Sequence, residues 1–228
     1  MSLRQHLRAL GTRFDAQALR PPLAVAHAAT LLQRHSALRD QLQAWCWQGA
    51  GPGNAAWWQP GAQPALGQRL AVAALWAPPA AADAGPAKST HLADWANAFA
   101  RQLDGSTGLG DLPSKLSVLQ LRLAVKLQDA QWWRPRQPTD PWDAGWTINT
   151  AAALQQLQQH WLPRRATLVL ADDRAADALR PCLAGLVQRS AAFLHPVRWV
   201  WVGGDDGHTA ASQGLPVARF AVGGLAAS

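Results

Sequence analysis

The chain has 228 residues, of which 49% are hydrophobic and 15% are charged, a composition that excludes a disordered protein. It is long enough to bury a core without disulfides, as one domain or two small ones. No apolar run approaches the roughly eighteen residues of a membrane span, so no membrane association is expected.

The net charge of +7 is typical of proteins with an anionic ligand or a nucleic-acid partner. All 14 acidic residues, however, are aspartates, and the chain has no glutamate, no tyrosine and 13 tryptophans. Glutamate is among the commonest residues of globular proteins, so its absence by itself moves the balance toward positive charge. The basic residues are also dispersed. The charge therefore gives only weak support to a nucleic-acid partner.

The two cysteines, Cys46 and Cys182, lie far apart and form neither a disulfide framework nor a metal-binding motif. Both belong to segments with apolar periodicity, which indicates buried thiols and a reducing compartment. The N-terminus lacks the apolar segment of a secretory signal. We therefore expect a cytoplasmic protein.

Residues 1–48 are predicted to be a helical segment that packs with an α/β domain at 49–228, as one unit. A first helix is expected at 23–32, and a second is expected to begin at Ser36 and to end before Gly49. Two consecutive helices are compatible with a DNA-binding helix-turn-helix. A plain helical hairpin is favoured, because no basic recognition face follows.

Two stretches without periodicity, 49–67 and 132–148, are predicted to be loops. Adjacent tryptophans in both, and arginines in the second, are residue types that hold a base or a protein partner by stacking and charge. The alternative is that the tryptophans fix these loops to the core. The candidate partner-binding residues are Trp57, Trp58, Trp132, Trp133, Arg134 and Arg136.

Between these loops, 70–76 is predicted to be a strand, followed by an amphipathic helix capped by Ser89 or Thr90. The Gly-rich stretch 104–115 ends in Ser-Lys and invites comparison with a phosphate-binding P-loop. It fails the pattern, because that motif needs Gly-Lys-Ser/Thr opening a helix after a strand. The stretch 119–127 alternates apolar and polar residues, which favours a strand, although a helical face also fits.

The stretch from Ala166 to His208 has the clearest pattern of secondary structure, and the predicted fold is built around it. Short apolar runs at 167–170 and 197–202 are typical of strands that are buried on both faces. The residues between them have helical periodicity, and this helix is expected to start or to kink near Pro181. A further helix is predicted at 151–161 and a last strand within 215–222. Strand, helix and strand predict a right-handed parallel unit.

Both predicted strands of this unit end at the same edge of the sheet, where ligands bind in open α/β folds. Acidic groups there suit Mg²⁺ binding and phosphoryl or phosphodiester chemistry. The candidate catalytic residues are Asp172, Asp205, Asp206 and His208. The candidate metal ligands are Asp172, Asp173 and Asp205. The plainer interpretation is that these aspartates and the adjacent glycines are turn and cap residues.

The fold class predicted from the sequence is α/β or α+β, with a helical N-terminal part packed on a mixed sheet that contains the C-terminal strand–helix–strand unit. Two functions fit the residues. The first is a ligand-binding domain or metal-assisted enzyme that uses the strand-end aspartates. The second is a non-enzymatic, basic, Trp-rich subunit that binds a protein or nucleic-acid partner. No known motif for zinc proteases or serine hydrolases is present.

Overall fold

The protein is built on a six-stranded mixed sheet with the strand order β1-β3-β4-β5-β2-β6. β1 is antiparallel to β3, and all other neighbours run parallel. The computed structural model describes residues 18–48, 69–77, 87–106, 141–193, 195–203 and 215–222. The strands are β1 (Leu19–Arg20), β2 (Leu70–Trp76), β3 (Asp143–Thr147), β4 (Thr167–Asp172), β5 (Val197–Val202) and β6 (Val217–Ala221).

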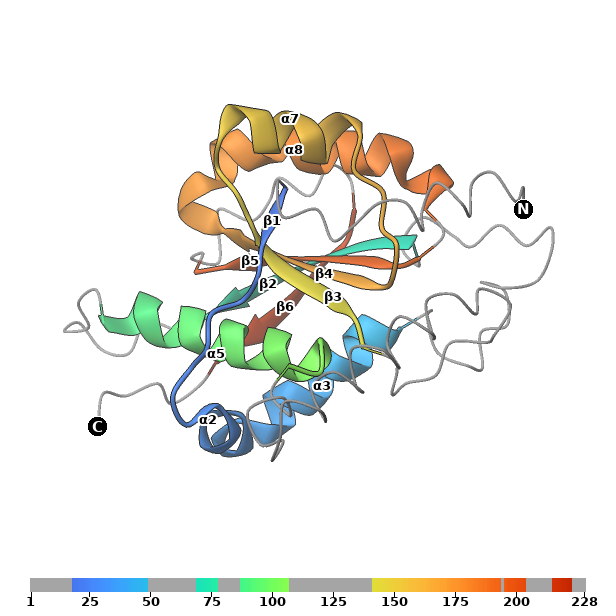
Figure 1. Cartoon of the computed structure of the whole chain (residues 1–228). Coiled ribbons are helices and arrows are strands. Elements are labelled where there is room, and N and C mark those ends of the chain that lie inside the picture. The colour runs from blue at the N-terminus through green and yellow to red at the C-terminus, as the bar shows by residue number, and fades with distance from the viewer. Residues whose placement is uncertain are drawn as a thin grey trace, which may run out of the picture.

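Helices cover both faces of the sheet, which makes a three-layer α/β arrangement (Figure 1). One face carries α2, α3 and α5, and the other carries α7 and α8. The helices are α2 (Ala28–Arg34), α3 (Ser36–Trp47), α5 (Ala87–Leu103), α7 (Ala151–Gln159) and α8 (Ala176–Arg189). Short 3-10 turns precede and follow α8, at Asp173–Ala175 and Ser190–Ala192.

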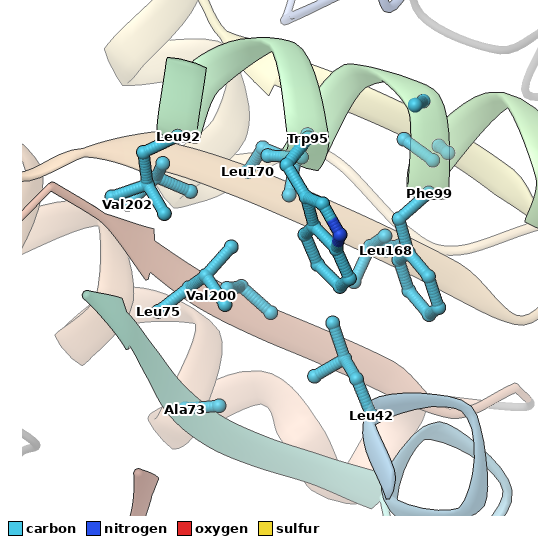
Figure 2. Close-up of a cluster of buried hydrophobic side chains, with 14 of the residues drawn as sticks. Leu42, Ala73, Leu75, Leu92, Trp95, Phe99, Leu168, Leu170, Val200 and Val202 are labelled. Atoms are coloured by element: carbon cyan, nitrogen blue, oxygen red, sulfur yellow. The ribbon is translucent and has the colours of Figure 1, made fainter. Parts of the chain in front are cut away.

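Strand β5 is apolar at every residue except Arg198, and the packing on both of its faces explains this composition. Successive side chains of a strand point to opposite faces, and here both faces are covered by helices. Trp199 and Trp201 pack with the core on the α7 and α8 side, while Val200 and Val202 pack with the core beneath α5. Figure 2 shows the second core, in which Trp95 and other side chains of α5 lie over the sheet.

The predicted fold class is confirmed, including the mixed sheet and the C-terminal strand–helix–strand unit. β2 and β5 have the predicted bounds, 70–76 and 197–202, and β4 is parallel to β5 and paired with it along its whole length. The helix predicted at 151–161 ends two residues earlier, at Gln159. The last strand, predicted within 215–222, comprises Val217–Ala221.

The prediction of a continuous loop at 132–148 is wrong, because β3 lies within this range and all five of its residues are buried. Asp143 and a glycine disfavour a strand, so local propensity hides it. Contacts with residues that are distant in the sequence stabilise the strand despite this low propensity. Arg164 forms an ion pair with Asp143, and the Trp146 Nε1–H donates to Asn97 Oδ1 at 2.8 Å.

Two predicted helix starts are also wrong. The helix expected at 23–32 begins only at Ala28, because His27 has a φ of 56°, a left-handed conformation that interrupts a right-handed helix. The other helix was expected to start or to kink near Pro181; it begins at Ala176 and contains that proline, so the start is wrong and the kink stays a prediction. A proline near the start of a helix forfeits one backbone hydrogen bond, which α8 tolerates.

The predicted strand at 119–127 lies outside the described residues. The predicted boundary after residue 48 stays a prediction, although α2 and α3 share a hydrophobic core with α5 and the sheet. No helix within the described ranges is long and apolar enough to cross a membrane.

Candidate functional site

The order of the strands reverses between β5 and β2. β3, β4 and β5 lie side by side in chain order, but the next strand across the sheet is β2. From β2 the chain continues into α5 on one face, whereas from β4 it continues into α8 on the other face. Leu215, which precedes β6, packs on the α8 side. Ligands of open α/β sheets bind in the crevice at such a reversal, outside the carboxyl ends of the strands.

Asp172 is the last residue of β4 and lies at this edge, opposite Val202 of β5 in the strand register. It is half-buried, and its Oδ1 accepts a hydrogen bond from the Arg174 N–H at 3.0 Å. Asp172 therefore caps the 3-10 turn that leads into α8. Because a carboxylate can accept about four hydrogen bonds, this cap uses only part of its capacity.

The residues next to Asp172 at this edge, Asp173 and Gly203, both lie where the backbone turns away from a strand. Asp173 is half-buried and begins the 3-10 turn. Gly203 follows β5 with a φ of 102°, and its N–H donates to Leu75 O at 3.1 Å. A side chain at position 203 would strain this left-handed conformation, so glycine is required where the chain leaves β5.

The structure therefore places Asp172 and Asp173 together at the carboxyl end of β4. The other predicted site residues, Asp205, Asp206 and His208, lie outside the described residues. Among the residues that are described, no three histidine, cysteine or aspartate side chains come close enough to hold a metal ion. A metal site at this edge would need a ligand molecule or further residues to complete it.

The predicted partner-binding residues also lie outside the described ranges; they are Trp57, Trp58, Trp132, Trp133, Arg134 and Arg136. The nine tryptophans that are described are all buried or half-buried. Several pack edge-on against other rings, as Trp47 does against Trp142 and Trp199 does against Trp201. In the described part of the chain, tryptophan fills the core.

Sequence reasoning missed the first turn of α5. This helix was expected to be capped by Ser89 or Thr90, but it begins at Ala87, so Lys88, Ser89 and Thr90 lie inside its first turn. The helix follows β2, the strand at the reversal. Lys-Ser-Thr opening a helix that follows a strand meets the positional part of the P-loop pattern, although Ala87 stands where that pattern has a glycine. The missing glycine hides this turn in the sequence.

The described helices give the two edges opposite electrostatic character. In parallel strand–helix–strand units the helix N-termini lie at the carboxyl edge of the sheet, and α5, α7 and α8 all follow this rule. The dipoles of these helices bring partial positive charge to that edge and partial negative charge to the amino edge. The dipoles therefore favour an anionic group at the carboxyl edge, where Asp172 and Asp173 also lie.

At the amino edge, arginines meet the helix C-termini. Arg189 donates to Leu157 O and Trp161 O at the end of α7, at 2.8 and 2.9 Å. Arg69 donates to Ala191 O at 2.6 Å in the turn after α8. The carbonyls of the last turn of a helix have no partner within that helix. Arginine side chains donate to them here, and the chain has no glutamate that would compete for these arginines.

Arg198, at the second position of β5, is the most buried of these arginines, with no exposed surface. Its Nε donates to Cys46 O at 3.0 Å and its Nη2 donates to Gln48 O at 2.6 Å, at the end of α3. The guanidinium also lies 5.9 Å from the ring centre of Trp45. Burial lowers the pKa of Arg198 to about 10 and raises that of the Cys46 thiol to about 12. The arginine therefore stays charged, and the thiol stays protonated and unreactive.

Two carboxylates complete the amino edge. Asp143 accepts from Arg164 Nε at 2.7 Å and from Arg164 Nη2 at 3.1 Å, which is a two-point pair. Asp104 follows α5, and burial raises its pKa, with a further contribution from the negative charge of Asp143. These acidic groups serve contacts within the fold.

Comparison of the chain with protein-family models, with curated proteins and with solved structures found no match.

Proposed function

We propose that the chain binds a nucleoside triphosphate, together with Mg²⁺, at the carboxyl edge between β5 and β2. The observation that carries this proposal is the position of Lys88, Ser89 and Thr90 in the first turn of α5, the described helix that follows the strand at which the order reverses. Phosphate groups bind at helix N-termini because the N–H groups and the helix dipole both favour negative charge.

The residue types of that turn match the chemistry. In the phosphate-binding P-loop, a lysine contacts the β- and γ-phosphates and the hydroxyl of the next residue binds Mg²⁺. Lys88 and Ser89 are in this order, in the first turn of the helix. Only three lysines occur in the whole chain, which makes one at this position more informative than it would be in a lysine-rich protein.

The aspartates at the end of β4 complete the proposal. In P-loop proteins an aspartate on another strand helps to hold the same Mg²⁺. Asp172 ends β4, Asp173 follows it, and β5 alone separates β4 from β2. Two strand spacings are roughly 10 Å. Because Mg²⁺ usually keeps several of its waters, a hydrated ion together with a phosphate group can bridge residues that are this far apart.

The sequence departs from the P-loop pattern at both glycines, with Ala82 and Ala87 in their places. Glycine allows the backbone to approach the phosphates closely, so its absence weakens the cradle. We therefore expect Mg²⁺-dependent binding that is weaker than in proteins with the full pattern. Asp205, Asp206 and His208, which follow β5 in the sequence, are the residues to which we assign any hydrolysis of the bound nucleotide.

The test is a set of thermal melts with ATP, ADP and pyrophosphate, each with Mg²⁺ and with chelator, and with Mg²⁺ alone. A ligand at 100 times its dissociation constant stabilises the folded state by roughly 2.7 kcal/mol, which is a clear rise in Tm. We expect this rise for the wild type with ATP and Mg²⁺. Lys88→Ala should abolish it, and Lys115→Ala is the matched control that should keep it.

No shift in the wild type at millimolar nucleotide, or an equal shift in the Lys88→Ala variant, would overturn nucleotide binding at this turn. The catalytic assignment is tested separately by phosphate release. Asp205→Asn should bind nucleotide as the wild type does and should release less phosphate. Binding without any phosphate release in the wild type would leave the site intact and remove the catalytic role.

A further inference from the structure

The end of α5 and the start of β3 are held directly against each other. The Trp142 N–H donates to Leu103 O at 3.0 Å, so the residue before β3 satisfies a carbonyl in the last turn of α5. The ring of Trp142 is buried in the same core as α5. Position 105 is also close, since a Cβ built on Gly105 would lie 3.8 Å from the Pro141 Cβ.

On the α5 side of this junction, the chain leaves the helix in a turn that is stabilised by its own hydrogen bonds. Gly105 has a φ of 77°, the left-handed conformation that commonly terminates a helix. Asp104 Oδ1 accepts from the Ser106 N–H at 2.7 Å, and Arg101 Nη2 donates to Ser106 O at 3.3 Å. The chain therefore leaves the helix through a turn whose polar groups are paired among themselves.

The β3 side is fixed by a different connection. The Asp143 N–H donates to Ala166 O at 2.9 Å, and the Asp143 carboxylate pairs with Arg164. Both partners belong to the segment between α7 and β4. The first residue of β3 is thus positioned by residues that follow it in the chain.

Only five described residues lie between the end of α5 and the start of β3: Asp104, Gly105, Ser106, Pro141 and Trp142. Connections from a helix to the next strand in α/β folds usually have two to six residues, roughly. The junction therefore has the length and the hydrogen bonds of an ordinary connection. The remaining 34 residues, 107–140, are inserted between Ser106 and Pro141.

We infer that residues 107–140 are a separable insertion, and that the three-layer fold forms and stays stable without them. The junction lies at the amino edge of the sheet, because α5 runs from the end of β2 to the start of β3. The proposed phosphate site lies at the opposite edge. Removing the insertion should therefore change neither the fold nor nucleotide binding.

The experiment removes 107–140 in two versions, one that joins Ser106 directly to Pro141 and one that adds a Gly-Ser-Gly-Ser linker. We expect one cooperative thermal transition, with a Tm equal to or above that of the full chain, because a shorter loop costs less entropy to close. The control deletion 104–140 also removes the Gly105 turn. It should lower the Tm or prevent folding.

Failure of both deletion versions to fold would overturn the inference, and a nicked chain tests separately whether the fold needs an unbroken connection here. A site-specific protease sequence is inserted between Leu123 and Ala124, and the purified full-length protein is cut there. The two halves should stay together in gel filtration and melt within a few degrees of the uncut chain. Separation of the halves, or a Tm that falls by more than about 10 °C, would overturn the inference. These melts need no nucleotide, so they stand even where the proposed function fails.

Discussion

The charged side chains at the two edges of the sheet have different kinds of partners. At the amino edge, Arg69, Arg189 and Arg198 donate to backbone carbonyls, and Arg164 pairs with Asp143. At the carboxyl edge, the described side-chain hydrogen bond of Asp172 goes to the backbone of the next turn. Charged side chains at the amino edge stabilise the fold, whereas we propose that charged side chains at the carboxyl edge bind a ligand.

The difference follows from the direction of the helices. The described helices between parallel strands, α5, α7 and α8, end at the amino edge, where their last carbonyls need donors. The chain supplies arginines there and has no glutamate that would compete for them. The helix N-termini at the other edge need acceptors, which aspartate or a phosphate group can supply. Substitutions at the two edges should therefore affect different properties.

The largest effect on stability is expected at Arg198. Arg198→Met keeps the length of the side chain but leaves Cys46 O and Gln48 O without their donors in a buried site. Buried acceptors without partners cost roughly 1–3 kcal/mol each. Relief from the buried charge offsets part of this cost, so we expect the free energy of unfolding to fall by about 2–4 kcal/mol. Urea denaturation measures it.

Arg39→Met is the matched control, because Arg39 forms an exposed pair with Asp40. Its free energy of unfolding should stay within about 0.5 kcal/mol of the wild type. Equal effects of the two substitutions would show that the Arg198 contacts contribute nothing to stability.

A smaller loss is expected at Asp143. Asp143→Asn removes the negative charge from a pair with a two-point contact, and the Asp143 side chain is only 9% exposed. The free energy of unfolding should fall by about 1–3 kcal/mol. Asp177→Asn, which disrupts a pair at a carboxylate that is 95% exposed, should have almost no effect in the same urea titration. A larger loss at Asp177 would contradict the ranking.

Asp104→Asn should raise the Tm at pH 7. Burial raises the pKa of Asp104 in the folded protein, so the ionised carboxylate is less favourable folded than unfolded. Asparagine removes that charge and can still accept from the Ser106 N–H. The gain should shrink as the pH falls and vanish below the unfolded pKa of about 3.9, where both states are protonated. Melting both proteins from pH 3.5 to 7.5 tests this, and a gain that is constant with pH would refute it.

The smallest effect on stability is expected at Asp172, at the carboxyl edge. Asn caps helical turns about as well as Asp, so Asp172→Asn should keep the bond to the Arg174 N–H. Its free energy of unfolding should stay within about 0.5 kcal/mol of the wild type in urea. Asp172→Ala removes the cap and should cost about 1 kcal/mol. A large loss in the Asn variant would mean that the charge itself supports the fold.

Periodicity in the sequence predicted most of the sheet. β2, β4 and β5 are continuous apolar runs, because both faces of these strands are covered, and they were placed with correct or nearly correct bounds. β3 was missed because Asp143 and Gly145 are poor strand formers, and the ion pair and buried contacts that reverse this preference come from distant segments. β1 has only two residues, which is too short for any periodic signal.

The candidate site was predicted in part. Asp172 and Asp173 lie at a strand end, as the short apolar run before them indicated. Lys88 carries no P-loop signature in the sequence, because Ala82 and Ala87 stand where that motif has its glycines. The reversal of strand order, which gives the first turn of α5 its significance, depends on which strands are neighbours. A single sequence does not contain that information.

The most direct test of the central claim is equilibrium binding of a fluorescently labelled ATP, with Mg²⁺ and with chelator, to the wild type and to Asp172→Asn. Because this variant should keep its cap and its stability, a change in binding reports on the ligand alone. We predict that Mg²⁺ tightens binding to the wild type at least tenfold and that Asp172→Asn loses most of this gain. Equal affinity with and without Mg²⁺, or equal Mg²⁺ dependence in both proteins, would contradict a phosphate and metal site at the carboxyl edge.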